Sequence, residues 1–96
     1  MLRITVTEGD SGQRWTLQGR LTKFSAPELI SHWNAKQNQS VARIVDLSEI
    51  TTIDKDGETV LSMMMRDGAE FVTSGVYTTY IVQELRKRPK GSQGRQ

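Results

Sequence analysis

The sequence contains no cysteine and one histidine, His32. Without cysteine the chain has no disulfide bonds, thiolate zinc site or cysteine nucleophile, which is typical of proteins in a reducing compartment. A single histidine leaves no paired-imidazole metal site. No apolar run approaches the roughly 20 residues that a membrane-spanning helix requires, and the first residues alternate apolar and polar side chains, unlike a secretory signal. We therefore expect a cytoplasmic protein without membrane insertion.

Catalytic and cofactor motifs are also missing. The chain has no Walker-type phosphate loop and no GxGxxG. The serine beside the histidine, Ser31, is its neighbour on a helix, and adjacent helical positions do not face one another. The acidic segment 46–58 contains part of an EF-hand pattern, but with Gly57 as the invariant glycine the first and twelfth ligands would be Thr52 and Met63. We expect no enzymatic activity, no cofactor and no metal site.

Charge is distributed unevenly along the 96 residues, which are enough for one domain. Five of the thirteen basic residues follow Glu84, and no acidic residue follows it. Residues 1–85 therefore hold eight bases against eleven acids, and the basic character of the chain belongs to its end. We expect one domain over residues 1–86 and a disordered basic tail over 87–96. Such a tail can hold nucleic acid weakly through phosphates, but we expect no specific nucleic-acid partner.

Hydrophobic periodicity predicts a β-hairpin followed by a helix. Apolar residues alternate with polar ones over 2–7 and again over 15–21, with a turn at 9–12, which indicates two antiparallel strands. The period then changes to that of a helix, because Leu29, Ile30 and Trp33 share one face. Ser25 and Glu28 have the spacing of a capping box with Pro27 in the first turn, so we expect this helix to begin there and to end near Asn38.

The second half of the chain predicts two further strands and two helices. The almost continuous apolar run 41–47 indicates a strand covered on both faces, and so a central one. A loop is expected over 48–54, a helix from about Asp56 to Gly68, a short strand over 69–73, and a helix ended by Pro89. In that last helix the residues expected to line the core face are Tyr77, Tyr80, Ile81 and Leu85. The order ββαβαβα predicts an α/β fold with a mixed four-stranded β-sheet, an opening antiparallel hairpin and helices packed mainly on one face.

Three short motifs resemble those of STAS domains, the family of the anti-sigma factor antagonists. The run from Ile44 to Gly57 resembles the family signature, in which a strand ending in Asp-Leu-Ser leads to Asp-Ser-Ser-Gly at a helix start. Gly19-Arg20-Leu21 resembles the Gly-Arg-Leu after the second strand, and Gly68-Ala69-Glu70-Phe71 resembles the Gly-Ala-x-Leu entry to a later strand. The resemblance covers about residues 2 to 86 and implies a STAS-like domain.

The resemblance implies a non-enzymatic, bacterial protein switch that acts in transcription regulation. Its partner, commonly an anti-sigma factor of the GHKL kinase type, binds around the helix start, and phosphorylation of the serine before the glycine breaks the complex. Here Lys55 and Asp56 stand where the family has serines. Asp56 is then either a fixed negative charge that imitates the phosphorylated form or part of an interface without a switch, and Thr51, Thr52 and Thr59 are alternative phosphosites. The expected partner-binding residues are Ser48, Thr51, Asp54, Lys55, Asp56, Gly57 and Glu58.

Two other roles compete with this one. Stand-alone STAS proteins also serve as accessory subunits on the ATPase of lipid-transporting ABC systems, and the methionine-rich helix face of Glu58, Ser62 and Met65, with Met63 and Met64 alongside, could be such a docking surface. A domain that binds a nucleotide or another small ligand is the remaining alternative. The sequence does not identify the partner or the oligomeric state.

Overall fold

The computed structural model describes residues 1–10, 12–36 and 42–87 of the chain. The seven elements, in order, are β1 (Leu2–Gly9), β2 (Gly12–Leu21), α1 (Ala26–Ala35), β3 (Arg43–Ile53), α2 (Lys55–Arg66), β4 (Glu70–Val72) and α3 (Val76–Lys87). This is the predicted order ββαβαβα. No helix in these ranges is long and apolar enough to cross a membrane. Pro89 and almost all of the expected tail lie outside the described residues, as does Asn38.

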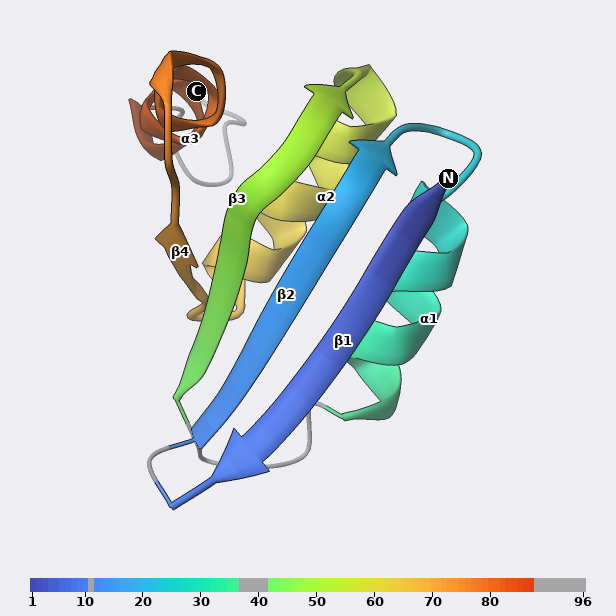
Figure 1. The fold of residues 1–96 in the computed structure, drawn as a ribbon, viewed down its shortest axis with the longest axis vertical. Helices are drawn as coiled ribbons and strands as arrows, with labels where there is room; N and C mark the ends of the chain where they lie inside the picture. The colour runs from blue at the N-terminus through green and yellow to red at the C-terminus, as the bar shows by residue number, and fades with distance from the viewer. Residues whose placement is uncertain (11, 37–41, 88–96) are drawn as a thin grey trace, which may run out of the picture.

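The strands form one mixed sheet in the order β1-β2-β3-β4. β1 and β2 are antiparallel, whereas β2 with β3 and β3 with β4 are parallel. Helices α1 and α2 lie side by side against one face of this sheet, and α3 lies beside the edge formed by β3 and β4 (Figure 1). The predicted α/β architecture, with its opening hairpin and its helices mainly on one face, is confirmed.

The core lies between the sheet and the helices α1 and α2. Alternation on β2 sends Trp15 and Leu17 to this side, where both are fully buried. From α1, Leu29 and Trp33 meet them, and the two tryptophan rings lie 5.0 Å apart in a tilted arrangement. The contact between the two aromatic rings stabilises the core beyond the gain from burying each ring. The opposite face of the sheet is mostly polar, and no described helix covers it (Figure 1).

The start of α1 differs from the predicted capping box. Ser25 occupies the N-cap position, but its side chain makes no capping hydrogen bond to the helix. Its hydroxyl instead accepts from the N–H of Thr22 at 3.0 Å and donates to the carbonyl of Arg20 at 2.8 Å. The serine therefore closes the turn between β2 and α1. Leu29 and Trp33 form the buried stripe as predicted, whereas Ile30 is half-buried and the helix ends at Ala35, three residues before Asn38.

β3 is longer than predicted, and the expected loop over 48–54 was wrong. The strand continues to Ile53, and its register against β2 shifts twice, between Thr16 and Gln18 and between Gly19 and Arg20. Each shift inserts one extra residue into β3, as a β-bulge does. The buried residues of this half of the strand are consequently Leu47, Ile50 and Ile53, at a spacing of three. A spacing of three hides a strand from a search for alternation.

The predicted core face of α3 was right for Leu85 and for Ile81, which packs against the core, but wrong for the two tyrosines. The buried residues are Thr78, Val82 and Leu85, whereas the side chains of Tyr77 and Tyr80 are 44% and 59% exposed. Two apolar stripes run along this helix, and the aromatic one faces outward. Tyr77 has a polar reason for its position, because its hydroxyl accepts from the N–H of Ile53 at 2.8 Å and donates to the carbonyl of the same residue at 3.2 Å. β4 is shorter than the predicted 69–73.

Candidate functional site

The start of α2 is fixed by the carboxylate of Asp54. Asp54 is the N-cap residue, and its Oδ1 accepts from the N–H of Gly57 at 2.8 Å. The backbone carbonyl of Asp54 accepts from Glu58, and its own N–H donates to the carbonyl of Leu21 at the end of β2. Asp54, which was predicted as a partner-binding residue, is thus the capping residue of α2. The first turn of α2 is thereby tied to the end of β2.

Gly57 is buried where the first turn of α2 passes over the end of β2. A Cβ atom at this position would lie 2.4 Å from the carbonyl oxygen of Leu21 and 3.1 Å from the Cγ2 of Ile53. The glycine is needed because the helix and the strand backbone approach each other closely. Gly57 was predicted as a partner-binding residue, and the structure shows that its missing side chain makes room for β2 of the same chain.

The same carboxylate also holds the connection between β2 and α1. Asp54 Oδ2 accepts from the backbone N–H of Lys23 at 2.9 Å. The hydrogen bond from Gly57 lowers the pKa of Asp54 most, and those from Lys23 and Asp56, with the charge of Lys23, lower it further. One ionised side chain thus fixes two backbone segments that meet at the carboxyl ends of β2 and β3.

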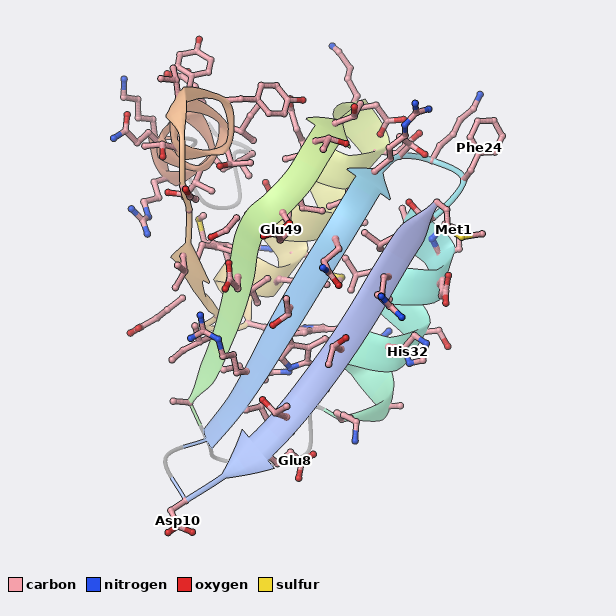
Figure 2. The ribbon with its side chains drawn as sticks, viewed as in Figure 1. Met1, Glu8, Asp10, Phe24, His32 and Glu49 are labelled. Carbon is pink, nitrogen blue, oxygen red and sulfur yellow. The ribbon has the colours of Figure 1, made fainter. Side chains whose placement is uncertain are left out.

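Phe24 is presented on this fixed turn. Its side chain is 86% exposed and projects from the end of the molecule where β2 ends (Figure 2). The ammonium group of Lys23 lies 5.3 Å from the centre of the ring. The N–H of Phe24 lies 3.3 Å from the hydroxyl of Thr22, which helps to fix the turn. A large apolar side chain on an ordered turn is a feature of protein interfaces.

A groove of about 500 Å³ separates α1 from α2 next to this turn. Ala26, Pro27 and Ile30 of α1 face Val60 of α2 across it. The remaining lining residues, which are polar or charged, are Lys23, Ser31, Asp56 and Thr59. The groove is therefore apolar along its walls and carries one positive and one negative side chain near the helix start.

The predicted binding residues divide into two groups. Lys55 and Asp56 are exposed in the first turn of α2, Glu58 is half-buried and Gly57 is buried. Ser48 and Thr51 do not belong to a loop at the helix start, because both are exposed residues of β3. Ser48 lies six residues before Asp54, which is roughly 20 Å along an extended strand. The hydroxyl of Thr51 donates to the carbonyl of Gly19 at 3.1 Å and so supports the bulged register.

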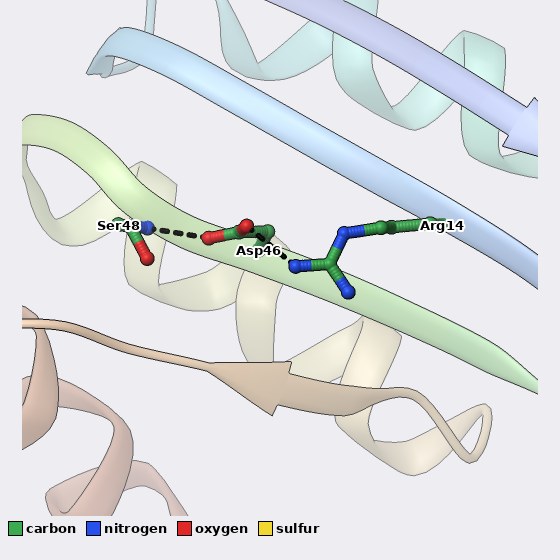
Figure 3. Close-up of polar contacts among 3 residues, drawn as sticks. All are labelled: Arg14, Asp46 and Ser48. Atoms are coloured by element: carbon green, nitrogen blue, oxygen red, sulfur yellow. Dashed lines mark hydrogen bonds and ion pairs between the residues drawn. The ribbon is translucent and has the colours of Figure 1, made fainter.

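Ser48 belongs to a polar cluster on the uncovered face of the sheet. Asp46 accepts from the N–H of Ser48 at 2.9 Å and pairs with Arg14 of β2 at 2.8 Å (Figure 3). Partial burial would raise the pKa of Asp46, but the hydrogen bonds from Ser48 and Arg14 and the charge of Arg14 together lower it. The cluster joins β2 to β3 on this face.

The methionine-rich face of α2 is largely part of the core. Met64 is fully buried, and Met63 and Met65 are partly buried against the same cluster. Ser62 is half-buried. This face offers less free surface than the sequence indicated for a docking role. Across the ranges that the structure describes, no group of three or more His, Asp and Glu side chains is placed to hold a metal ion.

Lys23, Phe24 and the groove were not among the predicted site residues. Lys23 precedes Asp54 by 31 positions, and no local pattern predicts that the backbone N–H of Lys23 contacts the carboxylate of Asp54. One signal was available for Phe24, since it is a lone aromatic residue among Thr22, Lys23 and Ser25 and belongs to no periodic segment.

Solved structures with a similar fold include the following two. The first is an antisigma-factor antagonist STAS domain from Rhodobacter sphaeroides, with a TM-score of 0.60 and 18% identity, covering 77% of this chain and 86% of that chain. The second is an uncharacterized protein from Shewanella loihica with a SpoIIAA-like fold, with a TM-score of 0.59 and 10% identity, covering 86% of this chain and 75% of that one. No protein-family model and no curated protein matches the sequence. The chain thus has the STAS-like, SpoIIAA-like fold that its motifs indicated.

Proposed function

We propose that the protein is a non-enzymatic regulatory module that binds a protein partner through the start of α2 and the adjoining β2–α1 turn. The observation that carries the proposal is the double hydrogen bond of Asp54, which holds the first turn of α2 and the backbone of Lys23 together. Phe24, Lys55 and Asp56 surround this point on a rigid support. A preordered surface loses little conformational entropy when it binds.

The proposed interface has a chemically distinct centre and edge. Phe24 supplies an apolar anchor, and the groove between α1 and α2 can receive an apolar side chain of the partner. Lys55 and Asp56 provide charges at the edge, where they set orientation and selectivity. Ser48 and Thr51 precede the helix start, on β3, and their contacts belong to the sheet. We therefore place them outside this surface.

Asp56 is the residue at which this chain differs from the resembling family. It occupies the position at which the resembling family has a phosphorylatable serine. A carboxylate in the first turn of a helix is stabilised by the helix dipole. We propose that Asp56 gives the surface a permanent negative charge and that a cationic group of an anti-sigma-like partner reads it. No phosphorylation at this position is then needed for, or able to interrupt, the interaction.

A small apolar ligand is the second candidate, because the groove volume falls in the range of small-molecule sites, roughly 300–1,000 Å³. Ile30→Trp would fill the groove from the α1 side and leave the residues at the start of α2 unchanged. If the domain is a small-ligand receptor, this variant loses the ligand. If the groove serves a protein partner, the variant weakens that complex and gives no ligand-binding defect.

An ABC-transporter ATPase as partner, bound through the methionine-rich face of α2, has less support because those methionines pack against the core.

Site-specific photo-crosslinking in cells of the source organism tests the proposal. A benzophenone side chain is placed at Phe24 or Lys55, and in controls at Glu49 or Asp10. Figure 2 shows Glu49 on the sheet and Asp10 at the opposite end of the molecule from Phe24. We expect one discrete crosslinked protein from the first two positions and not from the controls. Crosslinks confined to Glu49 or Asp10 would place the interface elsewhere and refute the proposal.

A further inference from the structure

β1 forms an open edge of the sheet. It pairs with β2 at eight consecutive positions without a register shift, and no described element pairs with its other side. The strand contains no proline, lysine or bulge, which are three of the usual means by which proteins block an edge strand. The opposite edge is different, because β4 has three residues and α3 lies beside it (Figure 1). β1 is therefore the edge that can accept another strand.

The free hydrogen-bonding groups of this edge can be assigned from the ladder with β2. The N–H of Arg20 donates to the carbonyl of Met1 at 3.1 Å, so these two residues form a hydrogen-bonded pair. In an antiparallel pair of strands every second residue directs both backbone groups to its partner, and the odd-numbered residues of β1 therefore bond β2. The even-numbered residues direct their N–H and C=O groups outward. These residues are Leu2, Ile4, Val6 and Glu8.

The same even-numbered residues carry apolar side chains on the helix side of the sheet. Ile4 and Val6 pack against the core but are only partly buried, and no described strand lies beside them. Glu8, at the end of this row, is paired with Lys36 at 3.4 Å. An added strand would cover the exposed parts of Ile4 and Val6 with side chains of its own. The edge thus favours a strand with apolar residues at alternate positions.

Two arginines set the charge on the other side of this edge. Arg3 of β1 and Arg20 of β2 are exposed on the uncovered face, and neither forms an ion pair with a described residue. Arg20 lies opposite Met1, two positions from Arg3, so the two arginines are diagonal neighbours. Successive residues of an added strand face opposite sides of the sheet. An acidic residue between two apolar ones would therefore lie next to Arg3.

We infer that β1 binds an extended acidic segment of a partner protein, which adds to the sheet as a fifth strand. Backbone hydrogen bonds supply affinity in this kind of recognition, and alternate side chains supply specificity. A second copy of the chain fits the edge less well, because α1 projects past β1 on the helix side (Figure 1). Two copies paired through β1 would bring their α1 helices into the same space, whereas a single added strand requires only about 4.8 Å beside β1. This site is separate from the proposed interface at the start of α2, so either can fail without the other.

Amide hydrogen exchange, measured by NMR on the full chain, tests the inference. The probe is the blocked peptide acetyl-Ser-Val-Asp-Val-Asp-Val-Ser-amide. The outward amides of Ile4, Val6 and Glu8 should exchange quickly in the free protein. They should exchange about tenfold more slowly at a peptide concentration about ten times the Kd. The amides of Thr5 and Thr7 already bond β2 and should change less. A peptide with lysine in place of both aspartates should bind at least about tenfold more weakly.

Variants of the protein separate this site from general peptide binding. Arg3→Glu/Arg20→Glu should bind the acidic peptide about tenfold more weakly, because attraction becomes repulsion. The control Arg66→Glu/Arg86→Glu makes the same change of charge at exposed positions of α2 and α3 and should bind normally. Val6→Pro removes one outward N–H and no hydrogen bond to β2, so this variant should fold and bind about fivefold more weakly.

The pattern along β1 decides the outcome. Binding without slower exchange at the even-numbered residues would place the peptide elsewhere and overturn the inference, as would the absence of binding at about 1 mM peptide. Equal affinities of Arg3→Glu/Arg20→Glu and Arg66→Glu/Arg86→Glu would contradict the acidic character of the partner segment. Slower exchange at the same residues when the protein alone is concentrated would assign the edge to a second copy of the chain instead.

Discussion

The carboxylate of Asp54 accepts a hydrogen bond from the backbone N–H of Lys23 at 2.9 Å, across 31 residues of sequence. The other oxygen of the same carboxylate caps α2 through Gly57. One side chain therefore sets the position of the β2–α1 turn relative to the start of α2. The proposed interface takes its geometry from this contact, and its stability should depend on the ionisation of Asp54.

Acid should remove the contribution of Asp54. Its pKa is lowered in the folded protein, so its carboxylate stabilises the fold above the ordinary value of 3.8 and loses this effect as the pH falls through the lower, folded-state value. Asp54→Asn should lower the urea midpoint at pH 7 and flatten the acid limb of the stability profile. Asp10→Asn makes the same change of charge in an exposed turn and serves as the control. If the free energy of unfolding of Asp54→Asn fell with decreasing pH as steeply as that of the unchanged chain, the contact would not contribute to stability.

A methyl group at Gly57 should be poorly tolerated. Gly57→Ala would place its Cβ 2.4 Å from the carbonyl oxygen of Leu21, so the start of α2 must move. We expect a loss of about 1–3 kcal/mol in the free energy of unfolding, as is usual for overpacking. Gly9→Ala is the matched control, because a Cβ there meets no atom within 4 Å. Chemical denaturation of both variants measures the difference, and equal stabilities would contradict the close approach.

The hydroxyl of Tyr77 should anchor α3 to the end of β3. Tyr77→Phe removes both hydrogen bonds between the hydroxyl and the backbone of Ile53. The N–H of Ile53 then loses the hydroxyl oxygen that accepts its hydrogen bond. We expect a cost of about 1–2 kcal/mol in the free energy of unfolding. Tyr80→Phe, at the more exposed tyrosine of the same helix, should change stability by less than about 0.5 kcal/mol. If the two variants were equally stable, the contact at Ile53 would not matter.

Phe24 should matter for binding and not for folding. Phe24→Ala removes a side chain that is 86% exposed, so we expect a change of less than about 0.5 kcal/mol in the free energy of unfolding. The affinity for the partner captured by crosslinking should fall by about 2 kcal/mol or more, as for other aromatic anchors. Denaturation and calorimetric titration of the same preparation measure the two quantities. A variant with lost stability and unchanged affinity would show that Phe24 is structural.

Much of the fold followed from local patterns, because strict periods survive in those segments. The hairpin of β1 and β2 and the buried stripe of α1 were predicted from alternation and from helical spacing. β3 was cut short because two bulges change the spacing of its buried residues from two to three at Leu47, Ile50 and Ile53. In α3 the two tyrosines looked more like core residues than Thr78 and Val82, although Leu85 was predicted correctly, and local hydrophobicity cannot choose between two such faces.

The candidate site was predictable only in part. The cap formed by Asp54 follows from its place before a helix, and the helix start was predicted within one residue. The role of Gly57 required knowledge of how α2 crosses β2. The contact between Lys23 and Asp54, which places the turn carrying Phe24 next to the start of α2, arises from tertiary packing across 31 residues. Neither periodicity nor a short motif carries that information.

The most direct measurement compares the affinities of Asp56→Lys and Asp10→Lys for the captured partner. Both variants replace an exposed acid with a base, but Asp56 lies at the proposed interface and Asp10 lies at the opposite end of the molecule. We predict that Asp56→Lys weakens the complex at least about tenfold, which is about 1.4 kcal/mol, and that Asp10→Lys binds normally. Equal affinities of the two variants would contradict the assignment of the interface to the start of α2.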